Sequence, residues 1–288
     1  MDIVIYGFIQ SVALLLMGIG FSLVYGVSRL PNFAHGAIYV LTGFVAWTLL
    51  WTVGLPYPLA VVGALAVSGV AGVLLYQLVL RRIRGLEMSE VIASYAIGLA
   101  ILEGLRWWGF RGSIHSLPVF SEGVVFLFDV PVDHQRLFVV GVGAAVLVAL
   151  WLFTRFTRLG LALRGVAQDE RAAMMLGIDS DRTATIAVAL GSMLAGLGAV
   201  VLFPLGSVVI EEGYKVLIYA IAVCVVGGLG SWAGTVVASF VLGISQYVTV
   251  AYGKPHYQMV VMLAAIIVTL VVRPSGFFGR QKALEERV

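Results

Sequence analysis

The chain has 288 residues, of which 61% are hydrophobic and only 11% are Asp, Glu, Lys or Arg. A soluble domain has about 25% charged residues, so this chain carries too little charge to cover the outside of a water-soluble protein of its size. The composition excludes a soluble enzyme, a nucleic-acid-binding protein and a disordered chain. The mean hydropathy of +1.04 indicates instead a protein that crosses a membrane several times.

Apolar runs of spanning length follow one another along the chain. A helix that crosses the hydrocarbon core needs about 20 apolar residues. The first run has no basic residue before Arg29, unlike a cleavable signal peptide, so we expect it to be retained as a span. We predict an all-α, polytopic transmembrane bundle of eight to ten spans, forming a single domain over residues 1–288. The nine runs lie near residues 4–27, 33–51, 57–80, 89–108, 135–154, 183–205, 215–230, 235–252 and 256–272.

Basic residues gather in every second loop. The loops that follow residues 27, 80, 154, 230 and 272 contain most of the 18 Lys and Arg residues, and loops rich in these residues stay in the cytoplasm. We therefore predict a multi-pass protein of the inner (plasma) membrane, with its N-terminus outside and its C-terminus in the cytoplasm. Two loops are long: an outer one near 109–134 and a strongly charged inner one near 155–182.

The sequence lacks the motifs of an enzyme that acts alone. It contains no G-x-x-x-x-G-K-[ST] phosphate loop and no H-E-x-x-H zinc motif, and its four histidines are scattered. The single cysteine, Cys224, excludes an intrachain disulfide. We expect no catalytic residue, no metal site and no cofactor bound by this chain. Glu103 is the clearest carboxylate within a span, and Arg106 three residues later predicts an ion pair; a proton relay is the alternative.

Residues 168–178 (QDERAAMMLGI) in the inner loop predict a short amphipathic helix. Asp169 is a helix cap, Glu170 suits the positive end of a helix, and Gly177 ends it. Small and soft apolar side chains follow the cap, beside charges of both signs. A helix lying on lipid would be more uniformly basic, so we favour a knob that docks into a groove of a partner protein; lipid binding is the alternative.

Two segments should interrupt helices within the membrane. In residues 25–47, Pro31 disfavours helix at Leu30, and in residues 223–246 a run of glycines adds flexibility. Non-helical backbone at this depth must be buried in protein or line a cavity, so interrupted helices indicate a transport pathway. Close packing is the alternative for the second segment, through a G-x-x-x-G pair of Gly230 and Gly234. The candidate pathway residues are Asn32, His35, Gly36, Gly227, Gly228 and Gly230.

Four segments, in order, resemble the permease subunits of ABC importers for branched-chain amino acids, the hydrophobic amino acid uptake family. They cover most of the chain: NFAHGA (32–37), ALRGVAQDERAAMMLGID (162–179), VVGGLGSWAGTVVASFVLG (225–243) and RPSGFFG (273–279). The resemblance implies the broken-helix fold of a type II ABC importer permease. It also implies four kinds of partner: a second, related and longer permease, two cytoplasmic ATPases that bind ATP and Mg, a periplasmic or surface-tethered solute-binding protein that meets the outer loop, and the bilayer.

The same resemblance places part of the inner loop in the coupling helix that contacts the ATPases. The residues concerned are Asp169, Glu170, Arg171, Ala172, Ala173 and Gly177. ATP hydrolysis then belongs to the partner subunits, and this chain is a non-catalytic conduit.

The family leaves the cargo open between branched-chain or other hydrophobic amino acids, urea and short amides, and aromatic or dicarboxylic acids. Few fixed charges in the pathway favour a neutral or zwitterionic apolar solute. An ion-coupled secondary carrier is the alternative from another class, and it needs ionisable residues at mid-span. Only Glu103 and His35 are candidates, and neither lies clearly at mid-membrane. A structural assembly subunit would leave the broken segments unexplained, so we predict an importer permease.

Overall fold

The computed structural model describes residues 1–29 and 31–279, so Leu30 and the end of the predicted domain lie outside the described residues. Helices dominate this part of the chain, and each of the nine predicted apolar runs contains one long helix. The long helices are α1 (Asp2–Ser28), α2 (His35–Trp51), α3 (Tyr57–Leu74), α4 (Glu87–Gly104), α5 (His134–Phe156), α8 (Ser180–Leu202), α9 (Glu211–Gly227), α10 (Trp232–Tyr252) and α11 (Tyr257–Val272).

Shorter elements connect or extend these helices. A π-helix and a 3-10 helix continue α3, another π-helix continues α4, and a 3-10 helix follows α8. Two short helices fill the inner loop, and two strands form in the outer loop. They are η1 (Leu75–Val79), η2 (Leu80–Ile83), η3 (Leu105–Phe110), η4 (Phe203–Leu205), α6 (Arg158–Gln168), α7 (Glu170–Met175), β1 (Val124–Leu127) and β2 (Val130–Asp133).

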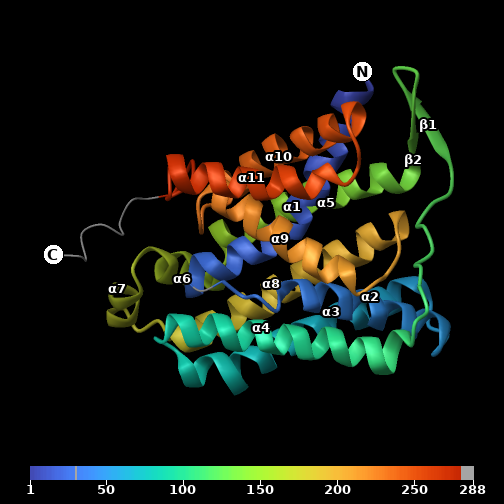
Figure 1. Ribbon diagram of the computed structural model, residues 1–288. Coiled ribbons are helices and arrows are strands. Elements are labelled where there is room, and N and C mark those ends of the chain that lie inside the picture. The colour runs from blue at the N-terminus through green and yellow to red at the C-terminus, as the bar shows by residue number, and fades with distance from the viewer. Residues whose placement is uncertain (30, 280–288) are drawn as a thin grey trace.

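Within the described residues, six helices are long and apolar enough to cross a membrane, and α2 and α11 are shorter apolar helices. The long helices lie side by side; the β1–β2 hairpin stands at one end of the bundle, and α6 and α7 lie at the other (Figure 1). α1 packs against α8 and α10. In an apolar stretch of 18 residues in α1, and in one in α8, 61% of the residues are buried. In the corresponding stretch of α5, only 22% of the residues are buried. The apolar side chains on the outside suit lipid rather than water, as the composition predicted.

The outer loop contains an antiparallel hairpin that the all-α prediction did not include. β1 pairs with β2 from Val124 opposite Asp133 to Leu127 opposite Val130. The turn residues Phe128 and Asp129 have φ of 51° and 64°, the left-handed backbone that a two-residue hairpin turn requires. Each strand has only 4 residues, which is too short to give a periodic signal in an apolar loop.

Both predicted interruptions are present. α1 ends at Ser28, Arg29 is left-handed with φ of 57°, and α2 begins only at His35. α9 ends at Gly227, Gly228 has φ of 101°, and the Ser231 hydroxyl accepts a hydrogen bond from the Gly234 N–H at the start of α10. The proline and the glycines therefore end helices where the sequence indicated.

The C-terminal RPSGFFG segment returns to the second interruption. The Phe277 N–H donates to the Val226 carbonyl at 3.0 Å, and the Phe278 N–H donates to the Gly227 carbonyl at 3.0 Å. These carbonyls belong to the last turn of α9, where a helix leaves its acceptors unpaired. The segment thus satisfies backbone groups that would otherwise be exposed at a helix end.

A candidate translocation groove and a candidate coupling helix

The first turn of α2 lies deep inside the bundle. His35 is 1% exposed, and its Nε2 lies 2.9 Å from the carbonyl oxygen of Met17. Met17 is roughly 23 Å along α1 from its start, at about 1.5 Å per residue, so it lies near the middle of this 27-residue helix. His35 is therefore near mid-bundle, a depth that the sequence did not make clear. The run from residue 33 reads as a full span, whereas the chain re-enters the bundle before α2 begins.

Polar contacts hold the non-helical segment before α2. Asn32 is 4% exposed, and its Oδ1 accepts a hydrogen bond from the Ala34 N–H at 3.0 Å. The next N–H, of Phe33, donates to Ser94 Oγ of α4 at 3.3 Å. The freed backbone donors are thus satisfied inside the protein, as non-helical backbone at membrane depth requires.

The first turns of α2 and α9 touch through glycines. A Cβ on Gly36 would lie 2.0 Å from the Gly213 carbonyl oxygen and 3.2 Å from Leu217 Cβ. Gly36 therefore permits a backbone contact that no other residue allows. α2 and α9, one from each half of the chain, both begin near this contact.

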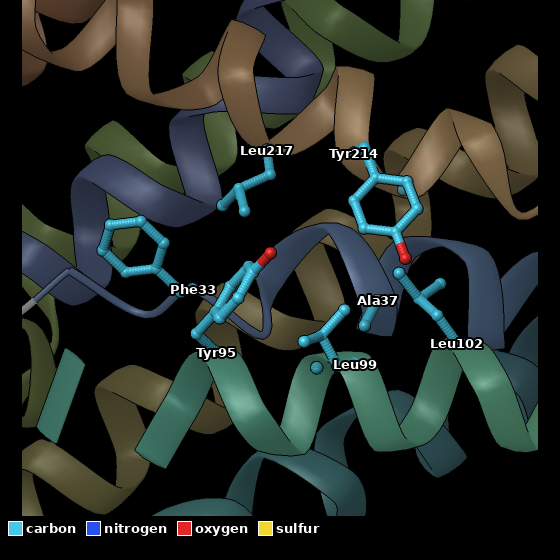
Figure 2. Close-up of a pocket in the computed structure, with 9 residues that line it drawn as sticks. Phe33, Ala37, Tyr95, Leu99, Leu102, Tyr214 and Leu217 are labelled. Atoms are coloured by element: carbon cyan, nitrogen blue, oxygen red, sulfur yellow. The ribbon is translucent and has the colours of Figure 1, made fainter. Parts of the chain in front are cut away.

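A groove opens beside this contact, between α2, α4 and α9. It holds about 230 Å³ of space, including open solvent. Tyr95 and Leu99 rise from α4 toward Leu217 and Tyr214 of α9 (Figure 2). The lining is apolar and aromatic apart from the two tyrosine hydroxyls, a composition typical of small-molecule sites. The full lining is Phe33, Ala37, Tyr95, Gly98, Leu99, Leu102, Gly213, Tyr214 and Leu217.

Charged side chains lie next to the groove, on α4 with its π-helical extension and on α9. Arg106 Nε lies 3.3 Å from Glu103 Oε2 and its Nη2 lies 3.8 Å from Glu211 Oε1, while Lys215 Nζ lies 2.6 Å from Glu212 Oε1. The predicted Glu103–Arg106 pair is confirmed. Both side chains are about half exposed, at 48% and 47%. Because charges facing hydrocarbon are costly, this face of the helices requires water or protein, not lipid, beside it.

The predicted pathway glycines of the second interruption lie elsewhere. A Cβ on Gly227 would lie 2.4 Å from the Gly234 carbonyl carbon, one on Gly228 would lie 2.3 Å from the Gly279 nitrogen, and one on Gly230 would lie 3.1 Å from Gly26 Cα. Gly234 of α10 thus contacts Gly227 of α9, and Gly230 contacts Gly26 of α1, so both glycines permit close backbone packing, each against a different helix. These glycines form backbone contacts at the other end of α9 from Gly213 and do not line the groove; their pathway role stays a prediction.

The candidate coupling helix is α7. Asp169 Oδ1 accepts a hydrogen bond from the Ala172 N–H at 3.0 Å, and Gly177 follows the helix with φ of 82°, so the predicted cap and end are confirmed. The helix has only 6 residues, because a separate helix, α6, occupies residues before the cap. Asp169, Arg171, Ala172 and Gly177 are exposed.

The exposed apolar surface of α7 differs from the prediction in one residue. Met175 is 89% exposed and Leu176 is 83% exposed. Ala173, which we placed on the docking surface, is 3% exposed and packs in a cluster with Val27 and Leu163. A six-residue helix has too few turns for its sequence to show which side packs inward.

Sequence reasoning missed the most buried carboxylate of the described chain. Glu90 is 2% exposed, whereas Glu103 is half exposed. Glu90 Oε1 accepts a hydrogen bond from the Gly85 N–H at 2.8 Å, and the side chain lines a small pocket with Pro31 and Asn32. Its place in the first turn of a helix resembles that of any surface carboxylate, so the sequence offers no local signal of burial.

Among the described residues, no group of three or more His, Cys, Asp or Glu side chains could hold a metal ion.

The family model described as branched-chain amino acid transport system / permease component matches residues 3–270. The chain belongs to this family. It is a multi-pass membrane protein and an ABC transporter permease, as the four sequence segments predicted.

Two relatives support this assignment, and one solved structure resembles the fold. LivH, the high-affinity branched-chain amino acid transport system permease protein of Escherichia coli, is 28% identical over 282 residues, covering 92% of this chain and 91% of LivH. BraD of Pseudomonas aeruginosa, a protein described in the same terms, is 29% identical over 281 residues, with the same coverage of 92% and 91%. A chain of PsaBC from Streptococcus pneumoniae, solved in complex with Fab, has a TM-score of 0.55 at 13% identity, covering 96% of this chain and 94% of that one. It shares the fold.

Proposed function

We propose that this chain forms one half of the translocation pathway of an ATP-driven importer for branched-chain or other hydrophobic amino acids. The observation that carries the proposal is the groove beside the contact between the first turns of α2 and α9, one helix from each half of the chain. Transporter substrate sites lie where the two halves meet, beside interrupted helices such as the one before α2. A lining of Leu99, Leu102 and Leu217 with three aromatic rings suits an aliphatic side chain, and the neighbouring charges of both signs suit a zwitterion.

The charged face beside the groove supports a second permease as partner. Arg106, Glu211 and Lys215 are exposed on this single chain, and a second, related permease packed against the same face would enclose them in a water-filled pathway. The hairpin end then faces outward, where a solute-binding protein delivers cargo. With α6, α7 and their arginines on the opposite side, the N-terminus lies outside and the C-terminus in the cytoplasm.

Two ATPase subunits supply the energy through α7. The chain itself is non-catalytic and binds no cofactor; ATP and Mg belong to the partners. Met175 and Leu176 form an apolar knob at the cytoplasmic end, and methionine adapts well to a partner's groove. A knob of this kind needs a partner because it leaves apolar surface in water.

The proposal is tested by blocking the groove. The complete complex is reconstituted in proteoliposomes, and ATP-dependent uptake of labelled leucine is measured for Leu99→Trp and for Val148→Trp. Val148 is 57% exposed on α5, away from the groove, and is the matched control. We expect Leu99→Trp to lower uptake more than tenfold, and Val148→Trp to leave it within twofold of wild type. Equal uptake by both variants would contradict the groove as pathway.

The transported solute is identified in the same vesicles by competition with labelled leucine. We expect unlabelled isoleucine and valine to compete with leucine, and urea and dicarboxylic acids not to compete. Leucine uptake without any ATPase subunit, driven by an ion gradient, would support the secondary carrier instead.

Docking of α7 is tested at its most exposed side chain. We expect Met175→Glu to fold, because nothing packs over a side chain that is 89% exposed. It should retain less than a tenth of the ATPase subunits in pull-down, since a carboxylate replaces apolar surface in the interface. Met175→Leu keeps that surface and serves as control. Full retention of the ATPases by Met175→Glu would place their docking site elsewhere.

A further inference from the structure

One arginine connects α7 to the helix that forms the wall of the groove. Arg84 lies between η2 and α4, and its guanidinium forms ion pairs with Glu170 at the start of α7 and with Asp181 at the start of α8. Its Nη2 also donates to Ser180 Oγ at 2.8 Å. Ser180 Oγ in turn donates to Glu170 Oε1. One guanidinium thus bridges two carboxylates from different helices, a task that its planar fork of donors performs and a lysine does not.

Further contacts fix this bridge on the side of α3. Arg81 Nε lies 3.3 Å from Asp181 Oδ2, and the Tyr76 hydroxyl donates to Asp181 Oδ1 at 3.3 Å. Arg84 is only 29% exposed, unlike the freely solvated pairs of a protein surface, which contribute little. The network is therefore a defined joint between α3, α7 and α8.

The residue after Arg84 connects this joint to α4. Gly85, the residue after Arg84, donates its N–H to the buried carboxylate of Glu90 in the first turn of α4 at 2.8 Å. The same helix carries Tyr95 and Leu99 into the groove. On the other side, α3 ends in a π-helix and a 3-10 helix, and such irregular turns often mark hinges or functional sites. A displacement of α7 that moves Glu170 therefore reaches α4 through Arg84 and Gly85.

We propose that Arg84 is the positioning residue that couples movement of α7 to movement of α4 and so to the width of the groove. The inference rests on the proposed function, since it assumes that α7 is displaced by the ATPases. Without Arg84, α7 would still dock, but its movement would no longer be transmitted to the wall of the groove. ATP would then be hydrolysed without uptake.

The first test compares Arg84→Gln with Arg82→Gln in the reconstituted complex. Arg82 is exposed, lies in the same connection and carries the same charge, so it is the matched control. We expect Arg84→Gln to retain the ATPase subunits and to hydrolyse ATP, with uptake per ATP reduced about tenfold. Arg82→Gln should match wild type. Should the two variants give the same uptake per ATP, the role of Arg84 is overturned.

The conservative variant separates charge from geometry. Arg84→Lys keeps the positive charge but cannot bridge Glu170 and Asp181 with a planar fork, so we expect an intermediate ratio of uptake to hydrolysis, about threefold below wild type. A wild-type ratio for Arg84→Lys would contradict the bridging geometry. This variant also covers the case in which Arg84→Gln fails to assemble.

A double-mutant cycle tests whether Arg84 acts through Glu170. If the two side chains act as one link, adding Glu170→Gln to Arg84→Gln lowers the ratio no further. Additive losses would show that the two residues act separately and would contradict the link.

Movement itself is followed by spin labels at Met88→Cys, at the start of α4, and at Gln168→Cys, beside the Asp169 cap of α7, in a Cys224→Ser background. Both positions are exposed, and Met175 stays intact for docking. With Arg84 present, we expect the distance between the labels to stay unchanged when ATP binds, because the two helices move together. In Arg84→Gln the distance should change. An unchanged distance in both would overturn the inference, whereas a wild-type complex without ATP-dependent uptake would overturn the proposed function and the inference with it.

Discussion

The two interruptions of the chain look alike in sequence and differ in structure. Each ends a long helix, the first at Ser28, shortly before Pro31, and the second at Gly227. The first is held by side chains, through Asn32 and the contact of Phe33 with Ser94, and it opens on the groove beside the single close contact of Gly36 with Gly213. The second is closed by backbone, with Gly227 against Gly234 and the C-terminal segment bonded to the end of α9.

The difference shows that two breaks that look alike in sequence can leave different amounts of room beside them. Glycines at a break permit close backbone contact, which excludes space for a solute. Polar and aromatic side chains at a break satisfy the freed backbone and leave room beside it. Because the surroundings of the two breaks differ, we expect substitutions at the second break to affect mainly stability, and substitutions at the first to affect mainly transport.

The largest effect is expected at the closed interruption. Gly227→Val places a side chain where the Gly234 backbone lies, and there is no flexible neighbour to move aside. Overpacking against backbone should lower the free energy of unfolding by about 3 kcal/mol or more, measured as a lower melting temperature in detergent and a reduced yield of folded protein. Gly141→Val on α5, where nothing lies within 4 Å of the added Cβ, is the control and should melt like wild type. A Gly227→Val protein that is stable but inactive would instead place this end of α9 in the pathway.

A smaller effect on folding and a clear effect on transport are expected at the open interruption. His35→Ala removes the contact with the Met17 carbonyl that fixes the start of α2, at a cost of about 2 kcal/mol. We expect uptake per folded complex to fall about fivefold, because the wall of the groove shifts.

Thr42→Val provides the matched control for His35→Ala. Thr42 is also buried in α2, but its hydroxyl bonds only to the Ile38 carbonyl of the same helix. Uptake per folded complex should stay near that of wild type. If His35→Ala also transports normally once corrected for folded protein, the histidine has a purely structural role.

The smallest effect is expected at the charges beside the groove. Arg106→Gln leaves Glu103 and Glu211 without the cation between them. Half-exposed pairs contribute about 0–1 kcal/mol, so stability should hardly change, while KM for uptake should rise about two- to threefold. Arg136→Gln, which removes a similar pair with Asp133 at the hairpin, should leave KM unchanged. A larger rise in KM for Arg136→Gln would move solute entry to the hairpin.

Local features of the sequence predicted local features of the fold. Pro31 and the glycines after Val226 marked both helix ends, because proline and glycine act on the backbone where they stand. Asp169 and Gly177 marked α7 for the same reason. The Glu103–Arg106 pair followed from helical spacing alone.

Features that depend on distant parts of the chain could not be predicted. The groove joins Phe33, Leu99 and Leu217, which are far apart in sequence and belong to no common motif. Ala173 faces inward because Val27 and Leu163 pack on it. Arg84 looks like one more cytoplasmic arginine until the positions of Glu170 and Asp181 are known.

The proposal that the groove is the path of the solute is tested most directly by measuring whether water reaches the groove in the assembled complex. The only cysteine of the chain, Cys224, is 0% exposed and is replaced by serine. The thiolate, which forms in water, is the nucleophile that attacks the maleimide double bond. We predict that Leu99→Cys reacts with a membrane-impermeant maleimide in at least one nucleotide state and that the reaction stops uptake, while Val148→Cys on the lipid-facing side of α5 does not react. A thiol at position 99 that stays unreactive in every nucleotide state would contradict the groove as the path of the solute.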